Sequence, residues 1–194
     1  MTKLPYLFPF LFLLILSLPA PATNPAFATG DPNEPIVRQY IESINAKDWN
    51  GIPALWIKSQ REMLAPFFNG KRNAQRKAGL FNIKQAALVS SRPIPYEYGS
   101  QFLPSFIDSL PDPQISYVAV YYQVHREDKY HLNGVNYFFI VTANENGNRR
   151  IALTPHVPTD QLISDGYGFG TPDEKSYRER RIKYVRNRDS KRQP

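Results

Sequence analysis

The chain has 194 residues, a formal net charge of +7 and no cysteine. The absence of cysteine excludes disulfides, thiol nucleophiles, thiolate metal sites and haem attached through cysteine. This length suits one domain with terminal extensions and leaves little room for two independent cores.

Residues 1–28 have the pattern of a secretory signal peptide. Lys3 supplies the charged start, the segment from Leu4 to Leu18 is apolar, and a small-residue cleavage site ends at Ala28. The alternative is a retained membrane anchor, but the apolar run is shorter than the roughly 20 residues of a spanning helix and contains Pro5 and Pro9. We therefore expect cleavage near Ala28 and a secreted or cell-wall-associated protein.

The segment from Glu34 to Ala46 predicts an amphipathic helix, because its apolar residues recur at helical spacing. These residues are Ile36, Val37, Tyr40, Ile41 and Ile44. A second, short helix has Pro53 in its first turn, where a missing N–H costs little. A third helix ends at Asn69-Gly70. The first third of the domain is therefore expected to be helical.

Four later segments favour strands, because they are rich in β-branched and aromatic residues. They are Leu80 to Ser91, Ile115 to His125, Val135 to Ala143 and Arg150 to Thr154. Turn residues at Asn133-Gly134 and at Asn144 to Gly147 separate the last three segments, which indicates an antiparallel meander. Helices followed by an antiparallel sheet predict an α+β fold.

Two stretches resemble nuclear-transport-factor-like domains. The opening helical hairpin of that superfamily is similar to the segment Val37–Trp56, with Tyr40, Ile44, Asn45, Lys47, Asp48, Trp49, Ile52 and Leu55. The closing hairpin is similar to VNYFFIVTANENGNRRIALTP, although Asn148 stands where many members have an aromatic residue. The resemblance implies a cone with cystatin-like topology over residues 29–157, in which N-terminal helices pack on a bent antiparallel sheet. It is closest to exported members from Gram-positive bacteria.

Enzymes of this superfamily hold an acid–base pair inside the cone. Here Asp48, at a helix–helix corner, is better explained as a backbone cap, and the strand segments Ile115 to Gln123 and Val135 to Ala143 contain no carboxylate or histidine. We therefore predict no catalytic residue and no cofactor. Strand tyrosines are ordinary core residues, and the alternative is a polar-lined ligand pocket formed by Tyr40, Trp56, Tyr117, Tyr121 and Tyr137.

The three histidines do not predict a metal site. His125 and His131 flank one hairpin turn and could face each other, but this leaves the third ligand unidentified. Glu127 and Asp128 are the nearest candidates, and charged residues at turn tips are usually only solvated. His156 has no evident partner. We therefore expect no bound metal.

The stretch DGYGFGTPDEK places three glycines at alternate positions ahead of a charged segment. This spacing matches neither the dinucleotide-binding nor the Walker signature, and no βαβ unit surrounds it. We therefore predict a flexible linker over residues 158–170. Thr171 and Pro172 then have the pattern of an N-cap and a first helical residue, so a helix is predicted to begin at Pro172.

Residues 171–194, here called the basic tail, contain nine Lys or Arg and four Asp or Glu. They lack a wide apolar stripe, so the tail is not expected to be buried deeply. One interpretation is a solvated tail. The other is attraction to an anionic cell-wall polymer or to lipid headgroups, through Arg178, Arg180, Arg181, Lys183, Arg186 and Arg188. Specific nucleic-acid recognition would contradict the signal peptide.

The leading hypothesis is an exported, non-enzymatic binding or accessory domain at the bacterial cell envelope, with the basic tail contacting anionic polymers. The alternative is a small-molecule enzyme, similar to isomerases or dehydratases, that uses the cavity of the cone. The resemblance also implies a homodimer formed through the open face of the sheet.

Overall fold

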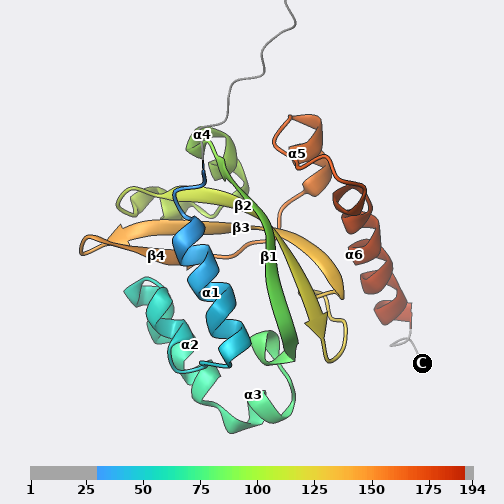
Figure 1. The fold of residues 1–194 in the computed structure, drawn as a ribbon, viewed down its shortest axis with the longest axis horizontal. Helices are drawn as coiled ribbons and strands as arrows, with labels where there is room; N and C mark the ends of the chain where they lie inside the picture. Colours follow the sequence, from blue (N-terminus) through green and yellow to red (C-terminus); the bar gives the residue numbers. More distant parts are fainter. Residues whose placement is uncertain (1–29, 191–194) are drawn as a thin grey trace, which may run out of the picture.

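The computed structural model describes residues 30–190, and side chains up to Tyr184. The predicted signal peptide lies outside this range. The described residues form an α+β fold in which helices pack on a four-stranded antiparallel sheet (Figure 1). No helix within residues 30–190 has the length and apolar character needed to cross a membrane.

The helical elements begin with α1 (Glu34–Ala46), which has the predicted bounds. The others are η1 (Ile52–Leu55), α2 (Lys58–Asn69), α3 (Lys71–Gln75), η2 (Gly79–Asn82), α4 (Tyr96–Gly99), η3 (Ser100–Phe102), η4 (Ser105–Ser109), α5 (Thr159–Ser164) and α6 (Pro172–Ser190). Between α1 and η1, the Oδ1 atom of Asp48 accepts a hydrogen bond from the N–H of Gly51 at 2.9 Å. Asp48 therefore has the capping role expected from the sequence.

The four strands are β1 (Ile83–Ile94), β2 (Gln114–Val124), β3 (Gly134–Glu145) and β4 (Asn148–Leu153). They follow one another in the order β1-β2-β3-β4, and each neighbouring pair is antiparallel, so the predicted meander is confirmed. At the β4 edge, the N–H of Ile57 donates to the carbonyl of Ile151 at 2.9 Å. The chain before α2 therefore extends the hydrogen bonding of the sheet.

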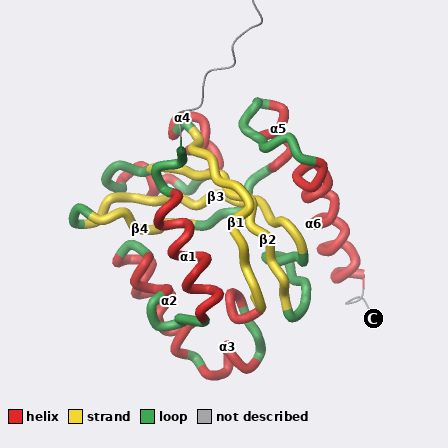
Figure 2. The backbone as a smooth tube through the Cα atoms, viewed as in Figure 1, coloured by secondary structure: helices red, strands yellow, loops and turns green. Residues whose placement is uncertain are grey.

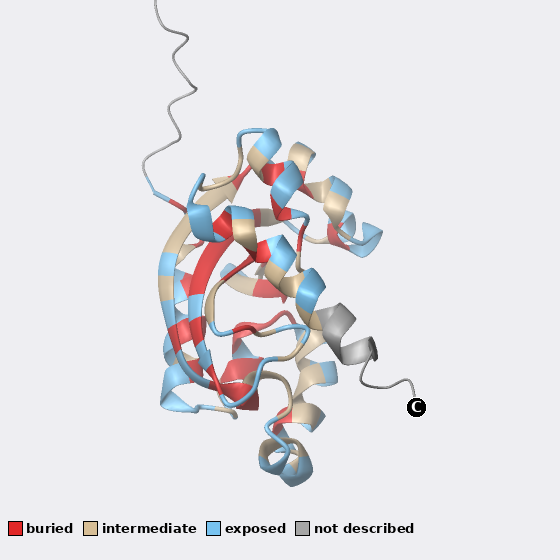
Figure 3. Cartoon of the chain, turned by 90° about the vertical axis from the view of Figure 1, so that its right-hand side faces the viewer, coloured by how far each residue is buried: buried red, intermediate tan, exposed pale blue. Residues whose placement is uncertain are grey.

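Both faces of the sheet are covered (Figures 1 and 2). One face packs against α1, η1 and α2 through residues such as Val118 and Ile140. The other face packs against α5 and the first turns of α6 through residues such as Tyr117 and Phe139. Figure 3 shows the buried segments running along the sheet and along the helix faces that contact it. Because both faces are buried, β2 and β3 are almost continuously apolar.

The segment 158–170 differs from the flexible linker that we predicted. Part of it forms α5, and its glycine-containing loop packs on the sheet. The ring of Phe169 stacks on that of Tyr117 with centroids 4.9 Å apart. The guanidinium of Arg92 donates to two carbonyls of the same loop, at 3.1 and 2.6 Å. The glycines therefore shape an ordered connection.

The helix α6 begins at the predicted residue, and the Thr171 hydroxyl caps it by accepting from the N–H of Glu174 at 3.2 Å. The expectation that this helix lies outside the core is wrong for its first turns. Glu174 is fully buried and its Oε1 atom accepts from the Tyr117 hydroxyl at 2.9 Å. Tyr177 is also buried, within the second core cluster. The burial occurs because two turns contact the sheet through polar and aromatic groups without a long apolar stripe.

Candidate functional site

The candidate site is a pocket of about 460 Å³ between α1, α2 and the loop that joins β2 to β3. We call it the His–aromatic pocket. One wall is formed by Tyr40, Trp56, Leu64, Phe67, Phe68, Gly79 and Leu80, and the other by Tyr130, His131, Thr154, Pro155 and His156. A recess of about 60 Å³ shares several of these residues and extends to Tyr122 and Phe138 on the sheet.

The aromatic wall is built where the first helices meet the sheet. Tyr40 lies on the buried face of α1, and its ring meets that of Trp56 nearly edge-on, with centroids 6.3 Å apart. Phe67 comes from α2 and approaches Gly79 closely, since a Cβ atom at Gly79 would lie 2.9 Å from its ring. Gly79 also has a φ of 54°. This position therefore needs glycine both for its backbone and for the contact.

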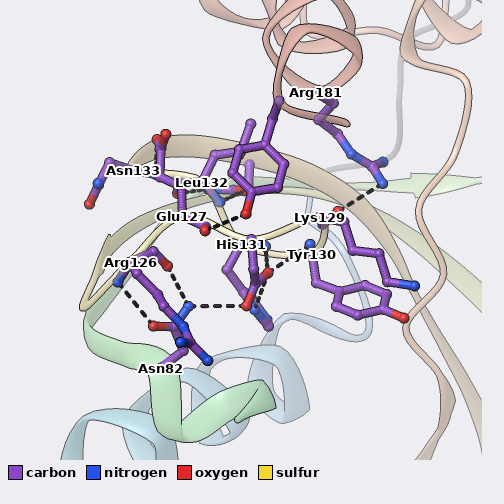
Figure 4. Close-up of polar contacts among 12 residues, drawn as sticks. Asn82, Arg126, Glu127, Lys129, Tyr130, His131, Leu132, Asn133 and Arg181 are labelled. Atoms are coloured by element: carbon purple, nitrogen blue, oxygen red, sulfur yellow. Dashed lines mark hydrogen bonds and ion pairs between the residues drawn. The ribbon is translucent and has the colours of Figure 1, made fainter. Parts of the chain in front are cut away.

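Asp128 shapes the opposite wall. Its Oδ1 atom accepts from the backbone N–H groups of Tyr130 and His131, both at 2.8 Å, and its Oδ2 atom accepts from Asn82 at 3.1 Å (Figure 4). Burial alone would raise the pKa of Asp128, but the nearby His131 ring and the two N–H groups hold it below its usual range. The His131 Nδ1 atom lies 3.4 Å from Asp128 Oδ1. Asp128 is therefore an ionised anchor for this loop.

His156 follows β4 and lies beside His131 in the pocket wall. Burial, together with the positive charge of Arg181, lowers the pKa of His156 to about 4. The ring is therefore neutral at neutral pH. Its Nδ1 atom and the Nε1 atom of Trp56 are buried and have no hydrogen-bond partner within the described part of the chain. The pocket thus contains polar atoms whose bonding capacity the protein does not satisfy.

The second half of α6 holds the loop that carries Tyr130 and His131. Three side chains of α6 donate hydrogen bonds to backbone carbonyls of this region: Arg180 to Asn133 at 3.2 Å and Val135 at 2.9 Å, Arg181 to Lys129 at 3.2 Å, and Tyr184 to Glu127 at 2.7 Å. Figure 4 shows Arg181 reaching from the helix to the loop. The basic tail therefore supports one wall of the pocket.

The predicted pocket residues divide between the two faces of the sheet. Tyr40 and Trp56 both line the His–aromatic pocket. Tyr117 and Tyr137 lie on the opposite face, where α6 covers them, so they do not join that pocket. Tyr121 is 42 % exposed. The assignment of these three tyrosines to one pocket with Tyr40 is therefore wrong, because alternate residues of a strand point to opposite faces.

The sequence interpretation missed His131 and His156 as pocket residues. The positions of the two histidines along the chain could have indicated this. His131 follows a hairpin turn. His156 lies in the segment that runs back along β3 after β4, where the N–H of Phe139 donates to the carbonyl of Pro155 at 3.0 Å. His125 is exposed and does not line the pocket. Within residues 30–190, no group of three or more His, Cys, Asp or Glu side chains is arranged to hold a metal ion.

The cations proposed for anionic-polymer binding have different surroundings. Arg178 forms an ion pair with Asp160, whereas Arg180 and Arg181 donate to loop carbonyls. Lys183 is exposed. The side chains of Arg186 and Arg188 lie outside the described residues. Three of the six predicted cations, Arg178, Arg180 and Arg181, therefore already contact the rest of the domain.

The sheet face on which we predicted a homodimer is covered by α5 and α6 over Tyr117 and Tyr137. That part of the face is therefore not open to a second copy. Dimerisation stays a prediction for the uncovered surface around Tyr121.

No family model, curated protein or solved structure matches this chain. The resemblance to nuclear-transport-factor-like domains therefore rests on the sequence pattern. What the pocket can do must be inferred from its own residues.

Proposed function

We propose that this protein is an exported, non-enzymatic binding domain of the bacterial cell envelope that holds a small, largely apolar molecule in the His–aromatic pocket. We also propose that its fold is the nuclear-transport-factor-like cone. The observation that supports binding is the pocket itself. Its volume of about 460 Å³, its aromatic wall and its few polar groups are typical of small-molecule sites.

Binding fits the protonation states of the pocket better than catalysis. Burial raises the pKa of Tyr40 and Tyr122 far above neutrality, so their hydroxyls stay protonated. His156 stays neutral and buried. A general base needs a pKa near the working pH and access to the proton that it removes. In the free protein these three side chains are therefore poor general bases and serve as polar contacts for a ligand.

One observation favours an isomerase- or dehydratase-like enzyme as a second candidate. His131 lines the pocket, and the carboxylate of Asp128 lies 3.4 Å from its Nδ1 atom. A carboxylate beside an imidazole orients the ring, which is the arrangement of many catalytic bases. This candidate predicts that a bound ligand is recovered chemically changed, whereas a binding domain returns it intact. Mass spectrometry of the recovered ligand distinguishes the two.

The binding proposal is tested with N-phenylnaphthylamine, a neutral probe that fluoresces in apolar surroundings. We expect saturable binding by the protein without its signal peptide. Substituting Leu64→Trp fills the pocket from α2 and should weaken binding at least about tenfold, since it removes the volume that the probe needs. The matched control is Met63→Trp, the neighbouring position on α2, where the side chain is 64 % exposed and does not line the pocket.

Circular dichroism checks that both variants are folded. Equal probe binding by the Leu64→Trp and Met63→Trp proteins would contradict the proposed site, because it would place the probe elsewhere on the molecule.

The proposal also keeps a role for the basic tail at the envelope, through those cations of α6 that the fold leaves exposed. Lys175, Arg178 and Lys183 are all exposed on the helix. Clustered cations near an anionic surface contribute about 1 kcal/mol each to its binding. The tail would thus hold the domain near teichoic acid or anionic lipid while the pocket stays free for a ligand.

A further inference from the structure

The polar side-chain groups that line the His–aromatic pocket are ring nitrogens and hydroxyl groups. The side chains that line it include the rings of Trp56, His131 and His156 and the hydroxyl groups of tyrosine and threonine, but no carboxylate, lysine or arginine. The nearest carboxylate, Asp128, already accepts hydrogen bonds from two backbone N–H groups and from Asn82. The oxygens of Asp128 therefore already accept hydrogen bonds from the loop that this residue anchors and from Asn82.

Three buried ring nitrogens of this lining lack a hydrogen-bond partner in the described part of the chain: Trp56 Nε1, His156 Nδ1 and His131 Nδ1. His131 Nδ1 has the Asp128 carboxylate 3.4 Å away, so the other two are the nitrogens left for a ligand. The Nε1–H of Trp56 can only donate a hydrogen bond. The Nδ1 atom of His156 accepts when the ring is neutral and donates when the ring is protonated. Both atoms would be satisfied by an oxygen acid: a carboxylate accepts from the indole and from an imidazolium. Such charge-assisted hydrogen bonds are about twice as strong as neutral ones.

Several groups around His156 act on its protonation, and they do not all act in the same direction. Burial, Arg181 on α6 and His131 on the loop disfavour its protonated form, while a backbone hydrogen bond to Tyr137 and the charge of Asp128 favour it. Tyr130 stacks on the His156 ring at 6.3 Å, and Tyr40 and Tyr122 enclose the recess with neutral hydroxyls. The guanidinium of Arg181 has nearby acceptors in the loop carbonyl that it contacts. A ligand anion entering here would meet positive potential from Arg181 without a competing free carboxylate.

We propose that the ligand is an amphiphilic carboxylic acid whose aromatic or aliphatic body lies on the Tyr40–Trp56–Phe67 wall and whose carboxylate pairs with protonated His156. This inference rests on the proposed function, since it names the class of molecule that the same pocket holds. The carboxylate arrives as an anion, and His156 takes up one proton from solvent as the pair forms. No covalent bond forms or breaks. Binding is therefore coupled to uptake of up to one proton for each ligand.

The coupling has a defined direction. The free ring is neutral through the neutral range, and a bound carboxylate favours its protonated form, so the complex holds more protons than the free protein. The affinity for an acid must then rise as pH falls from 7.5 to 5.5, by up to tenfold for each pH unit. A neutral molecule of the same shape gains nothing from that protonation, so its affinity should stay nearly constant.

Isothermal titration calorimetry with naphthoate and naphthalenemethanol tests this inference at both pH values, in two buffers of different ionisation enthalpy. For naphthoate we expect about tenfold tighter binding at pH 5.5 than at pH 7.5, which corresponds to an average uptake of about half a proton, with uptake approaching one proton at pH 5.5. For naphthalenemethanol we expect less than about a twofold change and no uptake. The comparison of these two ligands needs no variant, so it does not depend on how a substitution folds.

Two substitutions test whether His156 is the group that takes up the proton. His156→Asn should abolish the pH dependence of naphthoate binding, while His125→Asn, an exposed histidine outside the pocket, should leave it unchanged. Equal, pH-independent binding of the acid and the alcohol would overturn the inference and leave the binding function standing. Proton uptake that persists in His156→Asn would also overturn it, because the proton would then belong to another group. Failure of both ligands and of N-phenylnaphthylamine to bind would remove the proposed function itself.

Discussion

His156 links the stability of the folded chain to pH. An imidazole in the unfolded chain titrates near pH 6.5, whereas burial and Arg181 lower the pKa of folded His156 to about 4. Between these values the unfolded state binds more protons than the folded state, so acid favours unfolding. The ring therefore contributes nothing to the pH dependence above about pH 7 and reduces stability as the pH falls toward 4.

We predict that the free energy of unfolding of the protein falls between pH 6.5 and 4.5 by on the order of 2 kcal/mol through this histidine. Urea denaturation across that range measures it. His156→Asn should have a shallower dependence, since it has no group that titrates there. His125→Asn is the comparison: His125 is exposed, and although slight desolvation and three nearby lysines also lower its pKa, its removal should change the dependence less. Parallel profiles for the protein and His156→Asn would show that the ring is solvated in the folded state.

Residues whose partners lie within a few positions were predictable from the sequence. The caps at Asp48 and Thr171 depend on N–H groups three residues away, and both are present in the structure. The partner of Glu174 was not predictable, because Tyr117 lies 57 positions away and meets it only through the packing of a helix on the sheet. The proximity of His131 and His156 was not predictable for the same reason, because only the packing of the fold brings them into one pocket.

At the scale of elements, the strands and α1 followed from periodicity, while the packing of α6 did not. Its docked face consists of Glu174, Tyr177, Arg181 and Tyr184, which recur at spacings of three and four and therefore lie on one side of the helix. Glu174, Arg181 and Tyr184 form hydrogen bonds to the sheet or the adjoining loop, and Tyr177 packs its ring against that of Tyr137. A search for apolar residues cannot detect a helix face that binds mainly through hydrogen bonds.

The sequence predicted a tail that is not deeply buried, and such a tail could be removed without loss of stability; the packing of α6 predicts the opposite. A chain that ends at Gly170 loses Glu174 and Tyr177 and exposes Tyr137 together with the hydroxyl of Tyr117. We predict a loss of at least about 3 kcal/mol, since a large buried aromatic residue, the buried Tyr117–Glu174 hydrogen bond and the part-buried Tyr137–Thr171 hydrogen bond disappear. Thermal and urea unfolding measure this change.

The control for that truncation ends at Ser190 and removes only residues 191–194. It should unfold at the temperature of the full chain. A chain ending at Gly170 that unfolded at the same temperature would show that α6 is independent of the domain, as the sequence pattern first indicated.

At the scale of the whole molecule, helices cover both faces of the sheet. A partner can therefore bind at the charged surface of the helices or at the mouth of the pocket. The positive charge is not spread evenly, because nine of the 24 Lys and Arg residues belong to the basic tail. Docking of α6 divides that charge into an inward set, represented by Arg180 and Arg181, and an outward set. Only the outward set can attract an anionic surface without undoing the fold.

We predict that the protein without its signal peptide sediments with anionic vesicles or with teichoic-acid-bearing walls at low ionic strength. Release should follow as the Debye length falls from about 10 Å at 0.1 M salt to about 3 Å at 1 M. Replacing Lys175, Arg178 and Lys183 together by glutamine should weaken this adhesion by about 3 kcal/mol, at about 1 kcal/mol for each charge near the surface. The fold should survive, because all three side chains are exposed and the substitutions remove only the surface ion pair of Arg178 with Asp160.

The control removes the same charge from a different surface. Lys71, Arg72 and Lys77 are exposed on and beside α3, which packs on the opposite side of the sheet from α6 (Figure 1). Their replacement by glutamine lowers the net charge equally, so a general effect of charge would release both variants alike. If the tail orients the molecule at the envelope, the α3 variant should still sediment with the vesicles while the α6 variant stays in solution. Equal, salt-insensitive sedimentation of all three proteins would mean that the tail serves the fold and the pocket loop, and that the envelope is not its partner.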